Sequence, residues 1–160
     1  MSAKCRPGTG AALHGAGKKQ RAQGGVSLKD RVILHSDLNN FYASVERILY
    51  PELAGKPIAV CGDKEARHGV VLAKSEKAKR FGVRTGEAIW EAKRKCPNLI
   101  IRPVRFGLYG EYSRAVRQIY AQYTDKIEPF GIDECWLDVT HSSLFGSGAE
   151  IAEKIRKQVK

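Results

Sequence analysis

The 160-residue chain lacks several features that would place it in common protein classes. It has no run of about 18 apolar residues and no apolar stretch near its N-terminus, which argues against a membrane span and a secretory signal. Its four cysteines never approach a Cys-x-x-Cys spacing, so neither a zinc site nor a disulfide framework is expected. We therefore expect a cytoplasmic protein with reduced thiols and no membrane partner.

Acidic residues are absent before Asp30, whereas residues 1–29 contain six Lys and Arg side chains. This segment is rich in Gly, Ala and Lys, and it shows no helical or strand periodicity that could bury one face. We expect residues 1–29 to be a disordered basic tail, followed by a folded part over residues 30–160. A mitochondrial-type presequence is an alternative, although the Arg- and Ser-rich amphipathic helix of such presequences is missing.

The formal net charge of +11 leaves about +5 for residues 30–160 once the tail is set aside. A basic surface favours polyanionic partners, because neutralising phosphates releases counterions. The alternative is a basic protein without such a partner, and composition alone leaves both open.

Hydrophobic periodicity predicts alternating strands and helices along the rest of the chain. The first helix should place Phe41, Val45 and Ile48 on one face, begin at Asn39 or Asn40 and end before Pro51. The predicted strands cover residues 31–36, 56–61, 69–73, 99–102, 126–130 and 135–139. The further predicted helices cover residues 75–80, 87–95, 108–123 and 149–160. In the long helix, Tyr112, Val116, Ile119 and Tyr123 are spaced for one face. We expect an α+β fold with a ferredoxin-like sheet backed by helices.

Acidic residues occur where two strand-like runs meet their connections. Asp37 follows one run, and Asp133 and Glu134 lie in the turn between the last two predicted strands. Carboxylates placed there project past a sheet edge while the sheet holds their backbone. Three oxygen ligands of this kind suit Mg²⁺, which also binds waters and substrate phosphates. The alternative for Asp133 and Glu134 alone is a solvated turn, where Asp is common.

Three sequence blocks, in order, carry a family resemblance. They are His35–Glu46 (HSDLNNFYASVE), Ala78–Gly86 (AKRFGVRTG) and Ile127–Thr140 (IEPFGIDECWLDVT). Together they resemble the N-terminal palm and fingers of a Y-family translesion DNA polymerase of the DNA polymerase IV type. The resemblance implies a ferredoxin-like palm sheet with helices on one face, a small fingers subdomain, and an end before the thumb and little finger.

The resemblance implies a catalytic metal site. Asp37, Asp133 and Glu134 match the catalytic carboxylates, and the main-chain carbonyl of Leu38 would help to bind the nucleotide-associated metal. Two Mg²⁺ ions, with Mn²⁺ as a substitute, would stabilise the attacking and leaving oxygens of nucleotidyl transfer.

The resemblance also implies a nucleotide site. Tyr42 matches the steric gate that excludes a ribose 2′-hydroxyl, and Phe41 would lie near the nucleotide sugar and phosphates. The alternative for both rings is core packing. The fingers depart from the common pattern of a Tyr and an Arg on the triphosphate, since Glu76 and Lys79 stand at those positions. Lys79 binds phosphate as a point charge without the fork of Arg.

We therefore expect template-directed, error-prone DNA synthesis past lesions, with primer–template DNA and deoxynucleoside triphosphates as partners. A sliding clamp would bind through segments absent from residues 1–160, and this chain alone should have little activity. One alternative is a non-catalytic DNA-binding remnant that holds DNA through its basic surface. Another is a nucleotidyl cyclase-like palm, although the Tyr42 gate counts against it.

Overall fold

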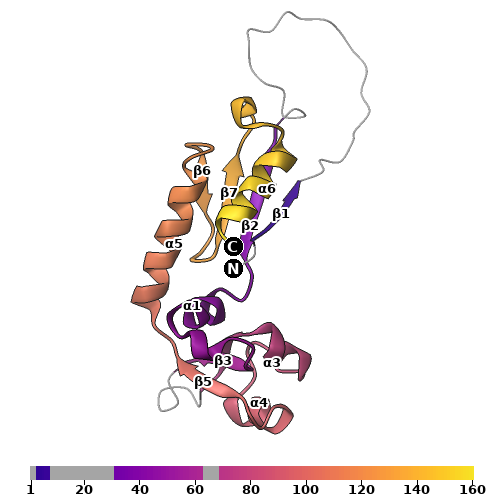
Figure 1. The fold of residues 1–160 in the computed structure, drawn as a ribbon, viewed down its shortest axis with the longest axis vertical. Coiled ribbons are helices and arrows are strands. Elements are labelled where there is room, and N and C mark those ends of the chain that lie inside the picture. The colour runs from indigo at the N-terminus through magenta and orange to yellow at the C-terminus, as the bar shows by residue number, and fades with distance from the viewer. Residues whose placement is uncertain (1–2, 8–30, 63–68) are drawn as a thin grey trace, which may run out of the picture. The chain divides into compact units, whose positions relative to one another are not determined.

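The computed structural model describes residues 3–7, 31–62 and 69–160, with side chains for the last two ranges (Figure 1). The chain divides into two compact units, one of residues 38–116 and one that combines residues 3–37 with 117–160. Helix α5 (Phe106–Tyr120) contributes its first part to one unit and its last part to the other. Each unit is described by itself.

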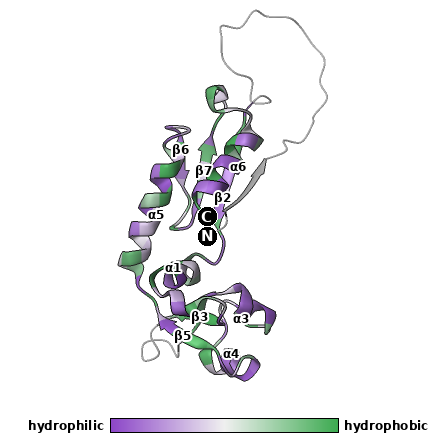
Figure 2. Cartoon of the chain, viewed as in Figure 1, coloured by the Kyte–Doolittle hydropathy of each residue, from purple (hydrophilic) through white to green (hydrophobic). Residues whose placement is uncertain are grey.

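The first unit is built on a three-stranded sheet of order β4-β3-β5. Its elements before α5 are α1 (Phe41–Leu49), the 3₁₀ helix η2 (Pro51–Leu53), β3 (Ile58–Cys61), β4 (Val71–Lys74), α3 (Glu76–Arg80), α4 (Ile89–Lys95) and β5 (Ile100–Pro103). The central strand β3 pairs antiparallel with β4 and parallel with β5. All four β3 residues are hydrophobic and buried, as expected for a strand covered on both faces (Figure 2).

Strand β3 is joined to the hydrophilic helix α3 through Ser75. The Ser75 hydroxyl accepts a hydrogen bond from the Ala78 backbone N–H, which caps α3, and another from the Ile58 backbone N–H at 3.0 Å. One serine thus fixes the start of the helix against the start of β3.

The second unit is built on a four-stranded sheet of order β1-β2-β7-β6. Its elements besides the end of α5 are β1 (Ala3–Pro7), β2 (Ile33–Leu38), β6 (Ile127–Pro129), β7 (Glu134–Asp138), the 3₁₀ helix η3 (Ser143–Phe145) and α6 (Gly148–Gln158). Strand β7 pairs antiparallel with both β2 and β6. The succession β2, α5, β6, β7, α6 is the first five elements of a ferredoxin-like βαββαβ unit, so the predicted α+β fold is confirmed.

Helices cover one face of this sheet. Leu34 and Ser36 of β2 are buried, and the Ser36 hydroxyl hydrogen-bonds the Tyr120 hydroxyl of α5 at 2.7 Å. Helix α6 approaches the same face so closely that a Cβ at Gly148 would lie 2.4 Å from Cγ1 of Val32. Since residues two apart on a strand share a face, α5 and α6 pack on the same side of β2.

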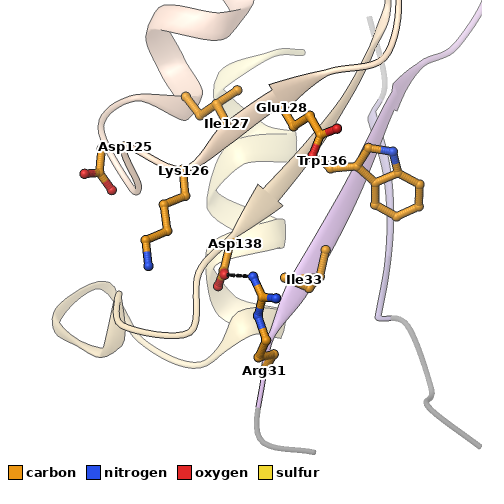
Figure 3. A pocket seen from close by; sticks show the side chains of 8 residues that line it. All are labelled: Arg31, Ile33, Asp125, Lys126, Ile127, Glu128, Trp136 and Asp138. Atoms are coloured by element: carbon orange, nitrogen blue, oxygen red, sulfur yellow. Dashed lines mark hydrogen bonds and ion pairs between the residues drawn. The ribbon is translucent and has the colours of Figure 1, made fainter. Parts of the chain in front are cut away.

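The opposite face of β2 and β7 carries polar and aromatic side chains. Three cross-strand pairs lie on it, namely Ile33 with Asp138, His35 with Trp136, and Asp37 with Glu134. Near the first pair, the Arg31 guanidinium bonds the Asp138 carboxylate beside a pocket of about 610 Å³ (Figure 3). We call this surface the open face.

Several details differ from the sequence predictions. Residues 3–7 form strand β1, so the expectation of a structureless tail is wrong there; pairing at a sheet edge uses backbone groups, which hydropathy does not reveal. The rest of the tail lies outside the described residues, and the boundary near residue 30 stays a prediction. Ile48 is half exposed, while Glu46 joins Phe41 and Val45 in the interior. In α5 the buried positions are Tyr109, Ser113, Val116 and Tyr120. Of the predicted face, Val116 is buried, Tyr112 and Ile119 are half-buried, and the buried Tyr123 lies just beyond the end of the helix.

Candidate active site

Two of the predicted catalytic carboxylates lie directly opposite each other. Asp37 on β2 is the register partner of Glu134 on β7, so both side chains leave the open face at the same end of the sheet. Asp133 immediately precedes Glu134, in the connection from β6. This connection includes Gly131 at a φ of +124°, which L side chains rarely adopt. The second unit therefore places Asp37, Asp133 and Glu134 at the same end of the sheet.

The electrostatics of Asp133 show that these carboxylates influence one another. Burial raises the pKa of Asp133 above its usual value, and the negative charges of Asp37 and Glu134 raise it further, while a backbone hydrogen bond within Asp133 acts in the opposite direction. The ionised form of Asp133 is thus disfavoured until a cation compensates the shared negative charge.

The donor set fits a hard divalent cation. Among residues 31–62 and 69–160, no three His, Cys, Asp or Glu side chains are already gathered as a metal-binding cluster. Asp37, Asp133 and Glu134 nevertheless offer only carboxylate oxygens, the ligands that Mg²⁺ and Mn²⁺ prefer. Burial raises the pKa of Asp133 most, and repulsion from Asp37 and Glu134 adds to it; a bound cation would relieve this repulsion.

A hydrogen bond and an aromatic stack lie beside the carboxylates on the open face. His35 Nε2 is 3.1 Å from Glu134 Oε2, and the His35 ring stacks on Trp136 with centroids 4.2 Å apart. Neither His35 nor Trp136 was predicted from the sequence to be a site residue. A signal existed, because His35 lies two residues before Asp37 and Trp136 two residues after Glu134, which places all four on one face.

The predicted nucleotide residues lie in the first unit. Phe41 is buried, and the half-buried Tyr42 ring stacks on Tyr109 with centroids 4.4 Å apart. Phe106 meets Tyr42 edge-on with centroids 6.1 Å apart. The aromatic residue proposed as the gate is therefore supported by two rings of α5, neither of which the sequence analysis had assigned to it.

Glu76 and Lys79, the two residues of α3 that differ from the family pattern, lie close together. Lys79 Nζ is 4.0 Å from Glu76 Oε1, and the Asn40 side-chain amide donates to the same oxygen at 2.8 Å. Asn40 occupies the N-cap of α1 with a φ of 52°, although its side chain does not cap the helix. Glu76 thus has the Lys79 ammonium group beside it.

A buried charge network holds α1 to β5 and α5 within the first unit. Glu46 is fully buried and accepts hydrogen bonds from Arg102 Nε at 2.9 Å, Arg105 Nη2 at 2.7 Å and the Tyr109 hydroxyl at 2.9 Å. Burial alone would raise the pKa of Glu46, but bonds from Arg105, Arg102 and Tyr109 hold it below the usual value. The Arg102 guanidinium also lies 4.2 Å from the Tyr50 ring centre.

The first unit has a pocket of about 490 Å³ whose lining is strongly basic. Four cations line it, namely Arg47, Lys56, Lys77 and Arg80. Glu76 is the acidic residue of its lining, and the half-exposed Phe81 completes the wall. We call this site the basic pocket.

Comparisons with known proteins connect the site to a family. Residues 36–160 match the impB/mucB/samB family. The chain is 58% identical over 131 residues to a protein named DNA polymerase IV from Acetivibrio thermocellus, covering 81% of this chain and 33% of that protein. It is 43% identical over 131 residues to DNA polymerase IV 1 of Bacillus subtilis, covering 82% of this chain and 32% of that one. The chain thus spans about a third of the length of these curated relatives.

Solved structures that match this chain include DNA polymerases as well. A ternary complex of Dbh DNA polymerase matches with a TM-score of 0.74 and 33% identity, covering 79% of this chain and 38% of that one. DinB from Sulfolobus solfataricus matches with a TM-score of 0.73 and 32% identity over the same shares of the two chains. Among the residues that the structure describes, no helix has the length and apolar character needed to cross a membrane. The chain belongs to the impB/mucB/samB family of Y-family DNA polymerases, as its three sequence blocks indicated.

Proposed function

We propose that this chain is the palm-and-fingers part of an error-prone DNA polymerase that copies damaged templates in the cytoplasm. The observation that carries the proposal is the convergence of Asp37, Asp133 and Glu134 at one end of the open face. It is supported by the DNA polymerase names of the curated relatives and by the ternary complex among the structural matches. The cyclase alternative has no such support.

The reaction joins a primer 3′-oxygen to the α-phosphorus of a deoxynucleoside triphosphate and breaks the bond from that phosphorus to the pyrophosphate oxygen. Two divalent ions, Mg²⁺ or Mn²⁺, would supply charge neutralisation for the entering and leaving oxygens. Asp37, Asp133 and Glu134 would hold these ions, together with the main-chain carbonyl of Leu38. Without the cations, the three carboxylates would also repel the anionic triphosphate.

Residues of the first unit would bind and select the nucleotide. Tyr42 would lie against the sugar and exclude a ribose by size, and its stack on Tyr109 would keep the ring from turning aside. Phe41 would contact the sugar and phosphates, and its burial in α1 would hold the neighbouring backbone rigid. Lys79 would offer a point charge to the triphosphate, moderated by Glu76.

A metal-dependent nucleotide-binding measurement tests this function on the 160-residue chain. We expect dATP to bind with Mn²⁺ and not with EDTA, and we expect Asp133→Asn to abolish the Mn²⁺-dependent part. Asp125→Asn is the matched control, since Asp125 is an exposed carboxylate of the same unit. Nucleotide binding that ignores both the metal and Asp133→Asn would contradict the polymerase assignment.

The basic pocket favours DNA binding as a second, separable activity. If the chain only holds DNA, binding will be salt-sensitive and will survive Asp133→Asn unchanged. Primer extension distinguishes the cases further. We expect little processive synthesis by residues 1–160, because they span about a third of the length of the curated DNA polymerase relatives. A sliding clamp would be a further partner of the whole polymerase.

A further inference from the structure

We infer that His35 is a positioning residue, which orients the Glu134 carboxylate for metal binding through a hydrogen bond. The inference rests on the proposed function, since it gives that function's metal site an additional required residue. The imidazole Nε2 lies 3.1 Å from Glu134 Oε2, across the pair of strands that carries Asp37 and Glu134.

The direction of the bond follows from the chemistry of the two groups. An ionised carboxylate only accepts hydrogen bonds, so the imidazole must donate from Nε2. The bond engages Oε2 and leaves Oε1 of Glu134 for a cation. Metal-ligating groups commonly have their orientation fixed by a neighbouring hydrogen bond of this kind, and loss of that neighbour costs about 10–100-fold in metal affinity.

The His35 ring is itself held in place by Trp136. The two residues are register partners, their ring centroids are 4.2 Å apart, and their planes differ by 20°. The His35 ring cannot turn about its Cβ–Cγ bond without losing contact area with the Trp136 ring. Packing therefore fixes the direction of the Nε2–H bond. Trp136 is 41% exposed, so the stack lies on the solvent-facing side of the sheet.

Two substitutions separate the hydrogen bond from the stack. His35→Phe keeps an aromatic ring against Trp136 and removes the N–H donor. His35→Gln keeps an N–H donor near the position of Nε2 and removes the aromatic stack. His141→Phe makes the same chemical change at an exposed site of the same unit and serves as the control.

The experiment titrates Mn²⁺ alone into the 160-residue chain and follows free Mn²⁺ by electron paramagnetic resonance. We expect His35→Phe to weaken Mn²⁺ binding about 10-fold or more, with His35→Gln and His141→Phe close to the unsubstituted protein. Circular dichroism melting of each variant, without metal, verifies that the chain is folded.

The outcomes separate this inference from the proposed function. If the unsubstituted chain binds Mn²⁺ through Asp133 but His35→Phe binds it equally well, the role of His35 is refuted and the metal site stands. If His35→Phe and His35→Gln weaken binding equally, the hydrogen bond is not responsible and the inference fails. If the unsubstituted chain does not bind Mn²⁺, the proposed function fails first and the inference falls with it.

Discussion

The ring of Tyr42 lies against the ring of Tyr109, with centroids 4.4 Å apart and 15° between the planes. Tyr109 is fully buried, and its hydroxyl donates to the buried carboxylate of Glu46 at 2.9 Å. The ring proposed to select deoxyribose is thus linked, through one tyrosine, to the charge network that joins α1, β5 and α5. Stability of that network and placement of Tyr42 are therefore coupled.

Alkaline pH should destabilise the protein through Tyr109. Burial, and then the hydrogen bond to Glu46, raise the pKa of Tyr109 from 10.0 to about 12. The unfolded chain therefore loses this proton first, and unfolding becomes more favourable as pH rises from 10 to 12. We expect the unsubstituted protein to lose on the order of 2 kcal/mol more than Tyr109→Phe across this range, measured by urea unfolding. If the free energy of unfolding falls as much in Tyr109→Phe as in the unsubstituted protein, this account is contradicted. Tyr112→Phe is the control and should behave like the unsubstituted protein.

Glu46→Gln should strongly destabilise the first unit. The substitution leaves Arg102 and Arg105 without their shared carboxylate, at a cost of roughly 2–4 kcal/mol in the free energy of unfolding at pH 7. Because the folded-state pKa of Glu46 lies below 4.5, its contribution is present above pH 4.5 and lost as pH falls through the folded-state value.

Urea unfolding between pH 3 and pH 7 checks the Glu46 prediction. The gap between the unsubstituted protein and Glu46→Gln should narrow toward low pH. Glu111→Gln, at an exposed position of α5, should leave the unfolding free energy nearly unchanged. A gap that stays constant with pH would show that the carboxylate charge is not the source of the stability.

Asp133→Asn should stabilise the metal-free protein while it removes metal binding. The raised pKa of Asp133 means that its ionised form is disfavoured in the folded state, so stability falls as pH rises through the range in which it ionises. Burial and the charges of Asp37 and Glu134 both disfavour the ionised carboxylate, and the neutral amide removes both costs. Thermal melting in EDTA and in Mn²⁺ tests both parts. A variant less stable than the unsubstituted protein in EDTA would count against this account, as would one that Mn²⁺ still stabilises.

The basic pocket should contribute to the salt dependence of DNA binding. We expect Lys77→Gln and Arg80→Gln each to reduce the slope of log K against log salt by roughly 0.7–0.9, as for loss of one phosphate contact. Lys93→Gln removes the same charge from an exposed position of α4 and should leave the slope unchanged. Equal effects at Lys93 and Lys77 would show that net charge, and not the pocket, governs binding. Fluorescence anisotropy with a single-stranded oligonucleotide over a salt series provides the slopes.

Local sequence signals predicted most elements, because their causes are local. Pro51 follows the end of α1 at Leu49, as the sequence indicated, and α3 falls within the helix predicted over residues 75–80. The hairpin of β6 and β7 was also predicted, since a glycine-containing turn separates two β-rich runs. The pairing of Asp37 with Glu134 needed more than local information, and the family resemblance supplied it.

Other features depend on partners far along the chain. Glu46 is charged, so its burial follows only from Arg102, Arg105 and Tyr109, which lie more than fifty positions away. The buried face of α5 is set by what it packs against, so the predicted set of Tyr112, Val116, Ile119 and Tyr123 included half-buried residues. The support of Tyr42 by Tyr109 likewise arises only when α1 and α5 meet.

Alternate residues of strand β2 face opposite sides of the sheet, which its composition alone does not reveal. Its odd-numbered residues, Ile33, His35 and Asp37, face the open side, and its even-numbered residues face the helices. Inserting or deleting one residue here would exchange the two sets, sending the Asp37 carboxylate toward Tyr120 and Leu34 into solvent. Evolution can therefore vary the side chains of this strand one at a time, but it can change the strand's length only in steps of two.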